Sequence, residues 1–340
     1  MEITVLLLLF ALAAGWLWWR VRARAEEQDE ESFLALFEAE SGAEAEADSD
    51  TEAESGSETE AESVADADTV SEPDSDSVSD SERKPKAPVR GTKRRRKTNP
   101  ALPVVLAHGM FGFDEVKLRG KRYEYFRGVR TALTREGAKV HVVKLAPTAA
   151  IEERAEGLAD AVRALGAEKV NLIAHSQGGV DARYAISRLG LARNVASLTT
   201  VGAPHRGTPL ADAGSKVLGK KAARVLRMEG VADLTTRRMK RFNREVPDAK
   251  GVAYHSVVGA VSGLVPARMH PLLLPGFLWM RDRAGVNDGV VPSDSQSWGE
   301  ILAEVDADHW AQIGWSKGAR GFDARDLYTG ILRELRARGF

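Results

Sequence analysis

From residue 103 to the C-terminus, short apolar runs alternate with longer amphipathic segments, and this alternation restricts the possible folds most strongly. Segments with helical periodicity, such as Ala149–Leu165 and Val180–Leu189, separate the apolar runs. Five runs have the length and the β-branched content of buried strands: Val104–Ala107, Val140–Leu145, Val170–Ala174, Val195–Val201 and Val252–Val258. This order is typical of an α/β fold, with a mostly parallel sheet and helices on both faces. Chemistry in such sheets takes place at the carboxyl ends of the strands.

The first 97 residues do not have the composition of a globular domain. Residues 26–82 contain 23 Asp or Glu and no Lys or Arg, and they have few large apolar side chains. We expect them to be a disordered acidic linker. Residues 83–97 contain nine Lys or Arg and no acid, which suits anionic lipid headgroups or the acidic linker itself. No nucleic-acid-binding motif accompanies this basic segment, so we expect no nucleic-acid partner.

Residues 1–25 hold a candidate membrane anchor. The run Ile3–Trp19 is almost wholly apolar and, at 17 residues, is at the short end of transmembrane helices. Three tryptophans at its end suit the membrane interface, and three arginines follow by residue 24. The alternative, a cleaved signal peptide, requires basic residues before the apolar run, where this chain has Glu2. We therefore expect an uncleaved single-pass transmembrane helix, with the remainder of the chain on the cytoplasmic side.

The remaining residues, 98–340, have the size of one α/β domain. They contain 36 basic and 25 acidic residues, so this part of the chain is positively charged. The sequence has no cysteine, which excludes disulfides, thiolate metal ligands and a cysteine nucleophile. The lack of cysteine also agrees with a reducing compartment, in which disulfides are rare.

The third apolar run leads directly into a turn that carries a serine, Ala174-His175-Ser176-Gln177-Gly178. A serine on a tight turn between a strand and a helix is typical of a nucleophile elbow, in which the residues two positions away must be small. The usual pattern has glycine at both of these positions, whereas here the first is Ala174. Such a turn presents the hydroxyl at a helix N-terminus to a histidine base. The alternative is an N-cap serine after a buried strand.

Four further segments accompany this turn in the sequence. They are His108-Gly109-Met110 after the first apolar run, the loop 202–209, the turn Asn287-Asp288-Gly289, and His309 near the C-terminus. The chain order serine, aspartate, histidine is that of α/β hydrolases. Together these segments, from about residue 103 to about residue 313, resemble bacterial triacylglycerol lipases of the Pseudomonas–Burkholderia–Proteus type. The resemblance implies the α/β-hydrolase fold and the hydrolysis of lipid esters.

Each motif residue has an expected role in ester hydrolysis. Ser176 is the expected nucleophile, His309 the general base, and Asp288 the acid that orients the histidine. The N–H of Gln177, directly after the nucleophile, is one expected donor to the oxyanion. The lipase resemblance places the second donor at Met110. In these lipases the spacing from the acid to the base is also similar to the 21 residues from Asp288 to His309.

Other residues compete for the acid and base roles. His270 is a weak competitor for the base, whereas His141 and His255 lie within apolar runs and are expected to be packed structural residues. The turn at Asp288 follows a possible strand, but Asn-Asp-Gly is also a common turn sequence. The alternative acids are Asp294, Asp306 and Asp308.

The lipases that this chain resembles hold a structural calcium ion near the catalytic histidine. Two of its carboxylate ligands would fall here at Ala311 and in the segment Pro266–Arg268, where no side chain offers an oxygen. Calcium requires several oxygen ligands. We therefore expect no metal and no cofactor, and we expect Gln312 to hold this loop by hydrogen bonds.

Leu210–Arg227 is the expected lid over the site. Val217 and Val225 belong to an apolar face with helical spacing, and lysines and arginines occupy the remainder, which suits an anionic lipid surface. A surface helix packed on the core is the alternative. The predicted function is that of a triacylglycerol lipase. The alternatives are a short-chain esterase, a phospholipase, a polyester depolymerase, or a non-catalytic binding module tethered to a membrane.

Overall fold

The structure is a computed structural model that describes residues 102–340, except 119–120, 263–268 and 319–320. The predicted transmembrane helix, acidic linker and basic segment lie outside these described residues. Within the described part of the chain, we find no helix long and apolar enough to cross a membrane.

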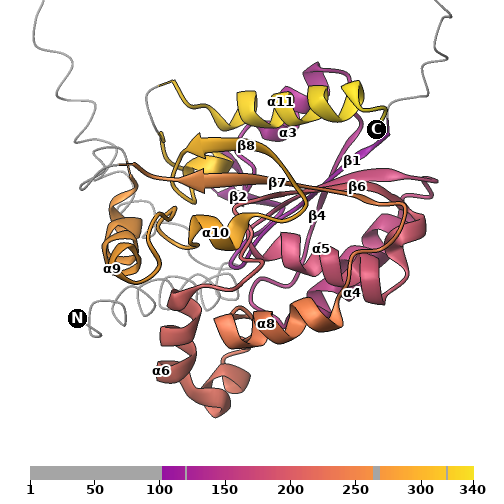
Figure 1. Cartoon of the computed structure of the whole chain (residues 1–340). Coiled ribbons are helices and arrows are strands. Elements are labelled where there is room, and N and C mark those ends of the chain that lie inside the picture. The colour runs from indigo at the N-terminus through magenta and orange to yellow at the C-terminus, as the bar shows by residue number, and fades with distance from the viewer. Residues whose placement is uncertain (1–101, 119–120, 263–268, 319–320) are drawn as a thin grey trace, which may run out of the picture. The chain divides into compact units, whose positions relative to one another are not determined.

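A six-stranded sheet forms the centre of the described domain (Figure 1). Its strands are β1 (Val104–Ala107), β4 (Val140–Val143), β5 (Val170–His175), β6 (Val195–Val201), β7 (Ala253–Ala260) and β8 (Glu300–Asp306). The spatial order is β4-β1-β5-β6-β7-β8, and every neighbouring pair is parallel. The five strands predicted from the sequence are confirmed to within two residues. A separate antiparallel pair consists of β2 (Glu115–Leu118) and β3 (Lys121–Glu124).

Helices cover both faces of this sheet (Figure 1). On one face lie α4 (Ile151–Ala164) and α5 (Gln177–Arg188), and on the other lie α3 (Val129–Arg135) and α11 (Ala324–Ala337). Alternate side chains of β1 serve the two layers. Val105 packs with α4 and α5, whereas Leu106 packs with α3 and α11. Because both faces are buried, β1 is a continuous apolar run rather than an alternating one.

The remaining helices lie in the connections between the strands and before α11. They are α6 (Pro209–Val225), α7 (Glu229–Asp233), α8 (Thr236–Glu245), α9 (Leu274–Ala284) and α10 (Ser293–Gln296), with short 3₁₀ turns at Leu191–Arg193, Pro271–Leu273 and Ala311–Ile313. The turn that carries Asp288 therefore follows α9, and the expectation of a strand before it is wrong. The apolar run Phe277–Met280 belongs to that helix, where it packs its buried face on the core.

The predicted lid coincides with α6, but α6 is not one continuous amphipathic helix. Gly219 has φ 66° and ψ 158°, which interrupts the helix. The break changes the rotational phase between the two halves, so the predicted single apolar face does not form. Val217 and Val225 are 54% and 81% exposed, whereas Ala223 is buried.

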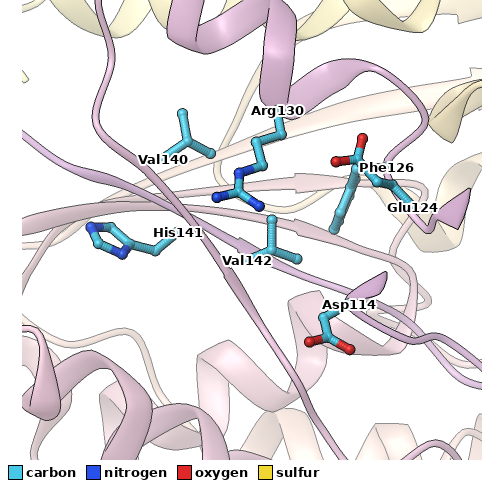
Figure 2. Close-up of a pocket in the computed structure, with 7 residues that line it drawn as sticks. All are labelled: Asp114, Glu124, Phe126, Arg130, Val140, His141 and Val142. Atoms are coloured by element: carbon cyan, nitrogen blue, oxygen red, sulfur yellow. The ribbon is translucent and has the colours of Figure 1, made fainter. Parts of the chain in front are cut away.

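A polar hollow of about 630 Å³ lies beside the edge strand β4 (Figure 2). Its lining carries four polar side chains and three apolar ones: Asp114, Glu124, Arg130, His141, Phe126, Val140 and Val142. Burial, followed by the nearby cations Lys139 and Arg130, lowers the pKa of His141, which favours its neutral form. None of the predicted site residues lines this hollow, so it is separate from the site described next.

Candidate active site

Ser176 occupies the turn between β5 and α5. Its φ of 55° and ψ of −131° are a strained conformation for a residue with a side chain, which costs of order 1–3 kcal/mol. The turn is tight because α5 packs directly on the end of β1. A Cβ atom at Gly178 would lie 2.7 Å from the carbonyl oxygens of both Ala107 and His108. The predicted strand–turn–helix context of Ser176 is confirmed, with the serine at the carboxyl end of a central strand.

The turn after β1 lies against this serine. A Cβ atom at Gly109 would lie 2.6 Å from the Cβ of Ser176, so only glycine permits the approach. The N–H of Phe111 donates to the carbonyl of Pro147 at 2.7 Å. The N–H of Met110 has no hydrogen-bond partner among the described residues. Gln177 is the first residue of α5, so its N–H has no acceptor within the helix.

Asp288 and His309, predicted from widely separated segments, form a hydrogen-bonded pair. Nδ1 of His309 donates to Oδ2 of Asp288 at 2.7 Å, and the N–H of His309 donates to the carbonyl of Asp288 at 2.9 Å. The Asp288 carboxylate is fully buried and accepts three more hydrogen bonds, from the N–H groups of Val290 and Val291 and from Nε2 of Gln312. Such a carboxylate fixes the histidine tautomer that leaves Nε2 without its proton.

The loop that carries His309 lies against the residue before Ser176. The rings of His175 and His309 have centroids 4.5 Å apart, and Nε2 of His175 lies 3.1 Å from the carbonyl oxygen of His309. This places the Asp288–His309 pair beside the turn of Ser176, as the predicted assignment requires.

The competing acids and the competing base have other partners. Asp306 bonds to Ser262, and Asp308 accepts hydrogen bonds from the N–H groups of His270 and Trp310. His270 packs its ring on Trp310, and its Nδ1 accepts the N–H of Leu272 at 3.3 Å. Asp294 lies in α10 and is exposed.

Hydrogen bonds within the protein hold the loop near His309. Nε2 of Gln312 donates to Asp288 at 3.0 Å, which confirms the role expected for Gln312. Oδ1 of Asp308 accepts from the N–H of Ala311 and from the hydroxyl of Ser316. Among the residues that the structure describes, no group of three or more His, Cys, Asp or Glu could hold a metal ion. The segment Pro266–Arg268, which the sequence analysis considered for a second calcium ligand, lies outside the described residues.

A buried arginine, which the sequence analysis missed, supports the turn after β1. Nε of Arg154 donates to Asp181 at 2.7 Å, and its Nη2 donates to the carbonyl of His108 at 2.7 Å. Both side chains of this ion pair are fully buried. Burial raises the pKa of Asp181 to about 7, against the opposing effect of Arg154. The sequence does carry a signal, because Arg154 interrupts the apolar stripe of α4 between Ile151 and Leu158.

His108 is a structural residue of the same turn. Its Nδ1 donates to the carbonyl of Gly109 at 2.9 Å, and its Nε2 accepts the N–H of Leu145 at 3.0 Å. Burial, helped by the charge of Arg154, lowers the pKa of His108 to about 3. The ring is therefore neutral at physiological pH and serves to fix the turn.

The chain is similar to known lipases and to one family of thioesterases. Residues 103–240 match the family model described as palmitoyl protein thioesterase. A triacylglycerol lipase from Vibrio cholerae is 32% identical over 252 residues, which cover 61% of this chain and 77% of that enzyme. A triacylglycerol lipase from Pseudomonas fragi is 30% identical over 253 residues, which cover 70% of this chain and 75% of that enzyme.

Solved structures agree with the fold. A Bacillus licheniformis lipase in its mature form superimposes with a TM-score of 0.55 at 21% identity, over 71% of this chain and 94% of that one. A metagenomic carboxyl esterase gives a TM-score of 0.58 at 18% identity, over 70% of this chain and 76% of that one. The parallel sheet, the serine turn and the identity to both lipases lead to one conclusion: the chain belongs to the triacylglycerol lipase family and is a carboxylic ester hydrolase with the α/β-hydrolase fold.

Proposed function

We propose that the chain hydrolyses lipid esters through a triad of Ser176, His309 and Asp288, with triacylglycerol as the preferred substrate class. The observation that carries the proposal is the strained serine turn beside the buried Asp288–His309 pair. Strained backbone of this kind is found where it exposes a reacting side chain. The identity to lipases that are named for triacylglycerol supports the substrate class.

In the first half of the reaction, Nε2 of His309 accepts the proton of the Ser176 hydroxyl while the serine oxygen attacks the ester carbonyl carbon. The carbonyl oxygen becomes an oxyanion, which accepts hydrogen bonds from the N–H groups of Met110 and Gln177. The tetrahedral intermediate collapses, His309 gives its proton to the leaving alkoxide, and the alcohol departs. Asp288 stabilises the imidazolium throughout.

In the second half, water attacks the carbonyl carbon of the acyl-enzyme and gives a proton to His309. The bond between the acyl group and Ser176 breaks, the fatty acid leaves, and the serine recovers its proton from His309. Neither half of the reaction uses a metal ion or a cofactor.

A second candidate substrate class is acyl thioesters. The match of residues 103–240 to the palmitoyl protein thioesterase model favours it. The chemistry differs only in the leaving group, because a thiolate departs in place of an alkoxide and the acyl-enzyme is the same. The two classes are therefore separated by relative rates rather than by mechanism.

The test measures hydrolysis by the wild-type full-length chain and by its Ser176→Ala variant, both in detergent. The four substrates are trioleoylglycerol emulsion, p-nitrophenyl butyrate, p-nitrophenyl palmitate and palmitoyl-coenzyme A. Ser293→Ala is the matched control, since its buried hydroxyl has no hydrogen-bond partner among the described residues. The proposal predicts that hydrolysis of trioleoylglycerol and palmitate depends on Ser176 and is unchanged in the control. Cleavage of butyrate alone would indicate a short-chain esterase, and retained activity in Ser176→Ala would remove the triad assignment.

A further inference from the structure

Tyr125 and His175 form a buried chain of hydrogen bonds between the two turns that flank Ser176. The N–H of Gly109 lies 3.2 Å from the Tyr125 hydroxyl, and that hydroxyl lies 2.8 Å from Nδ1 of His175. Nε2 of His175 lies 3.1 Å from the carbonyl oxygen of His309. Tyr125 is 8% exposed and His175 is fully buried, so water does not compete for these contacts.

Every proton in this series of hydrogen bonds has one possible position. The N–H of Gly109 can only donate, so the Tyr125 hydroxyl accepts it and gives its own proton to Nδ1 of His175. Nδ1 is therefore an acceptor, and the imidazole proton is on Nε2, which donates to the carbonyl of His309. Burial, and then the nearby His309, lower the pKa of His175 well below its usual range, so the ring stays neutral.

The chain of hydrogen bonds has a direct consequence for oxyanion binding. The N–H of Gly109 is bonded to Tyr125, and the next N–H along the turn, that of Met110, has no partner among the described residues. The Tyr125 hydroxyl fixes the Gly109 peptide plane, and the direction of the following N–H depends on that plane. At its other end the chain holds the backbone of His309 beside the serine turn.

We infer that Tyr125 and His175 are positioning residues for the hydrolysis, which together set the oxyanion turn at Gly109 and the loop of His309 relative to Ser176. This inference rests on the proposed triad. Neither side chain touches the substrate in this role. Their effect is to fix two backbone segments, so substitutions should change kcat rather than KM.

Tyr125→Phe removes only the hydroxyl, and Tyr328→Phe is its matched control. Both tyrosines are buried in the same core layer, but the Tyr328 hydroxyl has no hydrogen-bond partner among the described residues. In the full-length chain, Tyr125→Phe should lower kcat about 10- to 100-fold with KM changed less than about twofold, since small misplacements of catalytic groups cost rate of this order. Tyr328→Phe should keep the wild-type kcat.

Two substitutions at His175 test whether the two residues act as a unit. His175→Gln keeps an acceptor and a donor, so it should retain more activity than His175→Leu, which has neither. The double variant Tyr125→Phe/His175→Leu should be no slower than His175→Leu alone, because one broken bond already interrupts the chain. Effects on kcat that multiply, or a wild-type kcat in Tyr125→Phe, would overturn the inference.

Nitrogen NMR of the ¹⁵N-histidine-labelled wild-type chain tests the proton positions without a variant. The His175 ring should carry its proton on Nε2 alone between pH 6 and pH 9. A proton on Nδ1, or titration in this range, would overturn the inference even if the Tyr125 variants fail to fold. Ser176→Ala, run beside them, separates the two ideas: if it is inactive while Tyr125→Phe is unchanged, only the positioning inference is lost.

Discussion

Arg154→Met tests the ion pair that supports the turn after β1. The substitution keeps most of the side-chain volume, but it leaves the Asp181 carboxylate in a fully buried position without its cation. Breaking a buried ion pair in this way costs about 3–5 kcal/mol of unfolding free energy. For a domain of this size, that cost corresponds to a fall in Tm of about 6–20 °C. Urea denaturation and thermal unfolding measure the two quantities.

The loss should depend on pH in a defined direction. The folded pKa of Asp181 is about 7, already above the value of about 3.9 for an unfolded aspartate, and removal of Arg154 raises it further. A carboxyl whose pKa is higher in the folded than in the unfolded state loses stabilising effect as the pH rises from the unfolded pKa towards the folded pKa. The stability of Arg154→Met should therefore fall from about pH 4 upward and continue to fall beyond pH 7. A stability equal at pH 5 and pH 8 would contradict the assignment.

A double variant separates stability from catalysis. Arg154→Met/Asp181→Leu removes both charges, so much of the lost stability should return. Activity should not return, because the carbonyl oxygen of His108 still lacks its donor from Arg154. Full recovery of kcat in the double variant would refute a role for Arg154 at this turn. Arg163→Met is the control, since its exposed pair with Asp160 should contribute less than about 1 kcal/mol.

Three further predictions concern the triad, the oxyanion turn and the N-terminus. Asp288→Asn should lower kcat by about 10⁴-fold without unfolding the chain, because the histidine loses its fixed tautomer. Ester-hydrolysis kinetics measure kcat, and circular dichroism checks the fold. Gly109→Ala should abolish ester hydrolysis, since the new methyl group would lie 2.6 Å from the Cβ of Ser176. The rate of p-nitrophenyl ester hydrolysis measures this. The full chain should remain in the membrane pellet after alkaline carbonate extraction, whereas deletion of Ile3–Trp19 should release it.

The strands and the turn of Ser176 could be predicted because their signals are local. A buried parallel strand such as β5 is a continuous apolar run, and the serine turn follows it within the same ten residues. The edge strand β8 has no such signal. Its residues mix exposed charges, such as Glu300 and Glu304, with partly exposed apolar side chains in no regular pattern, and it pairs on one side only. The prediction of a strand before Asp288 was wrong for a related reason, because a short apolar run fits a helix as well as a strand.

The residues that hold the site together could not be predicted from local patterns. Tyr125 meets His175 across 50 residues of sequence, and Arg154 meets Asp181 across 27. Sequence periodicity places a residue on a face but does not reveal which distant backbone group will lie opposite it. Arg154 could have been singled out as a charge on an apolar stripe, although its partner could not.

The arrangement of these supporting contacts follows from where the proposed reacting groups lie. Ser176, Met110 and His309 belong to turns at one edge of the sheet, and turns lack the ladder of hydrogen bonds that fixes strands. Buried polar side chains bind these segments instead: Arg154 donates to the carbonyl of His108, Tyr125 accepts the N–H of Gly109, and Gln312 donates to Asp288, the partner of His309. Because an unpaired polar group is costly in such surroundings, each contact has few alternatives. The same low polarity that makes these contacts costly to lose also restricts the positions of the residues in the proposed triad.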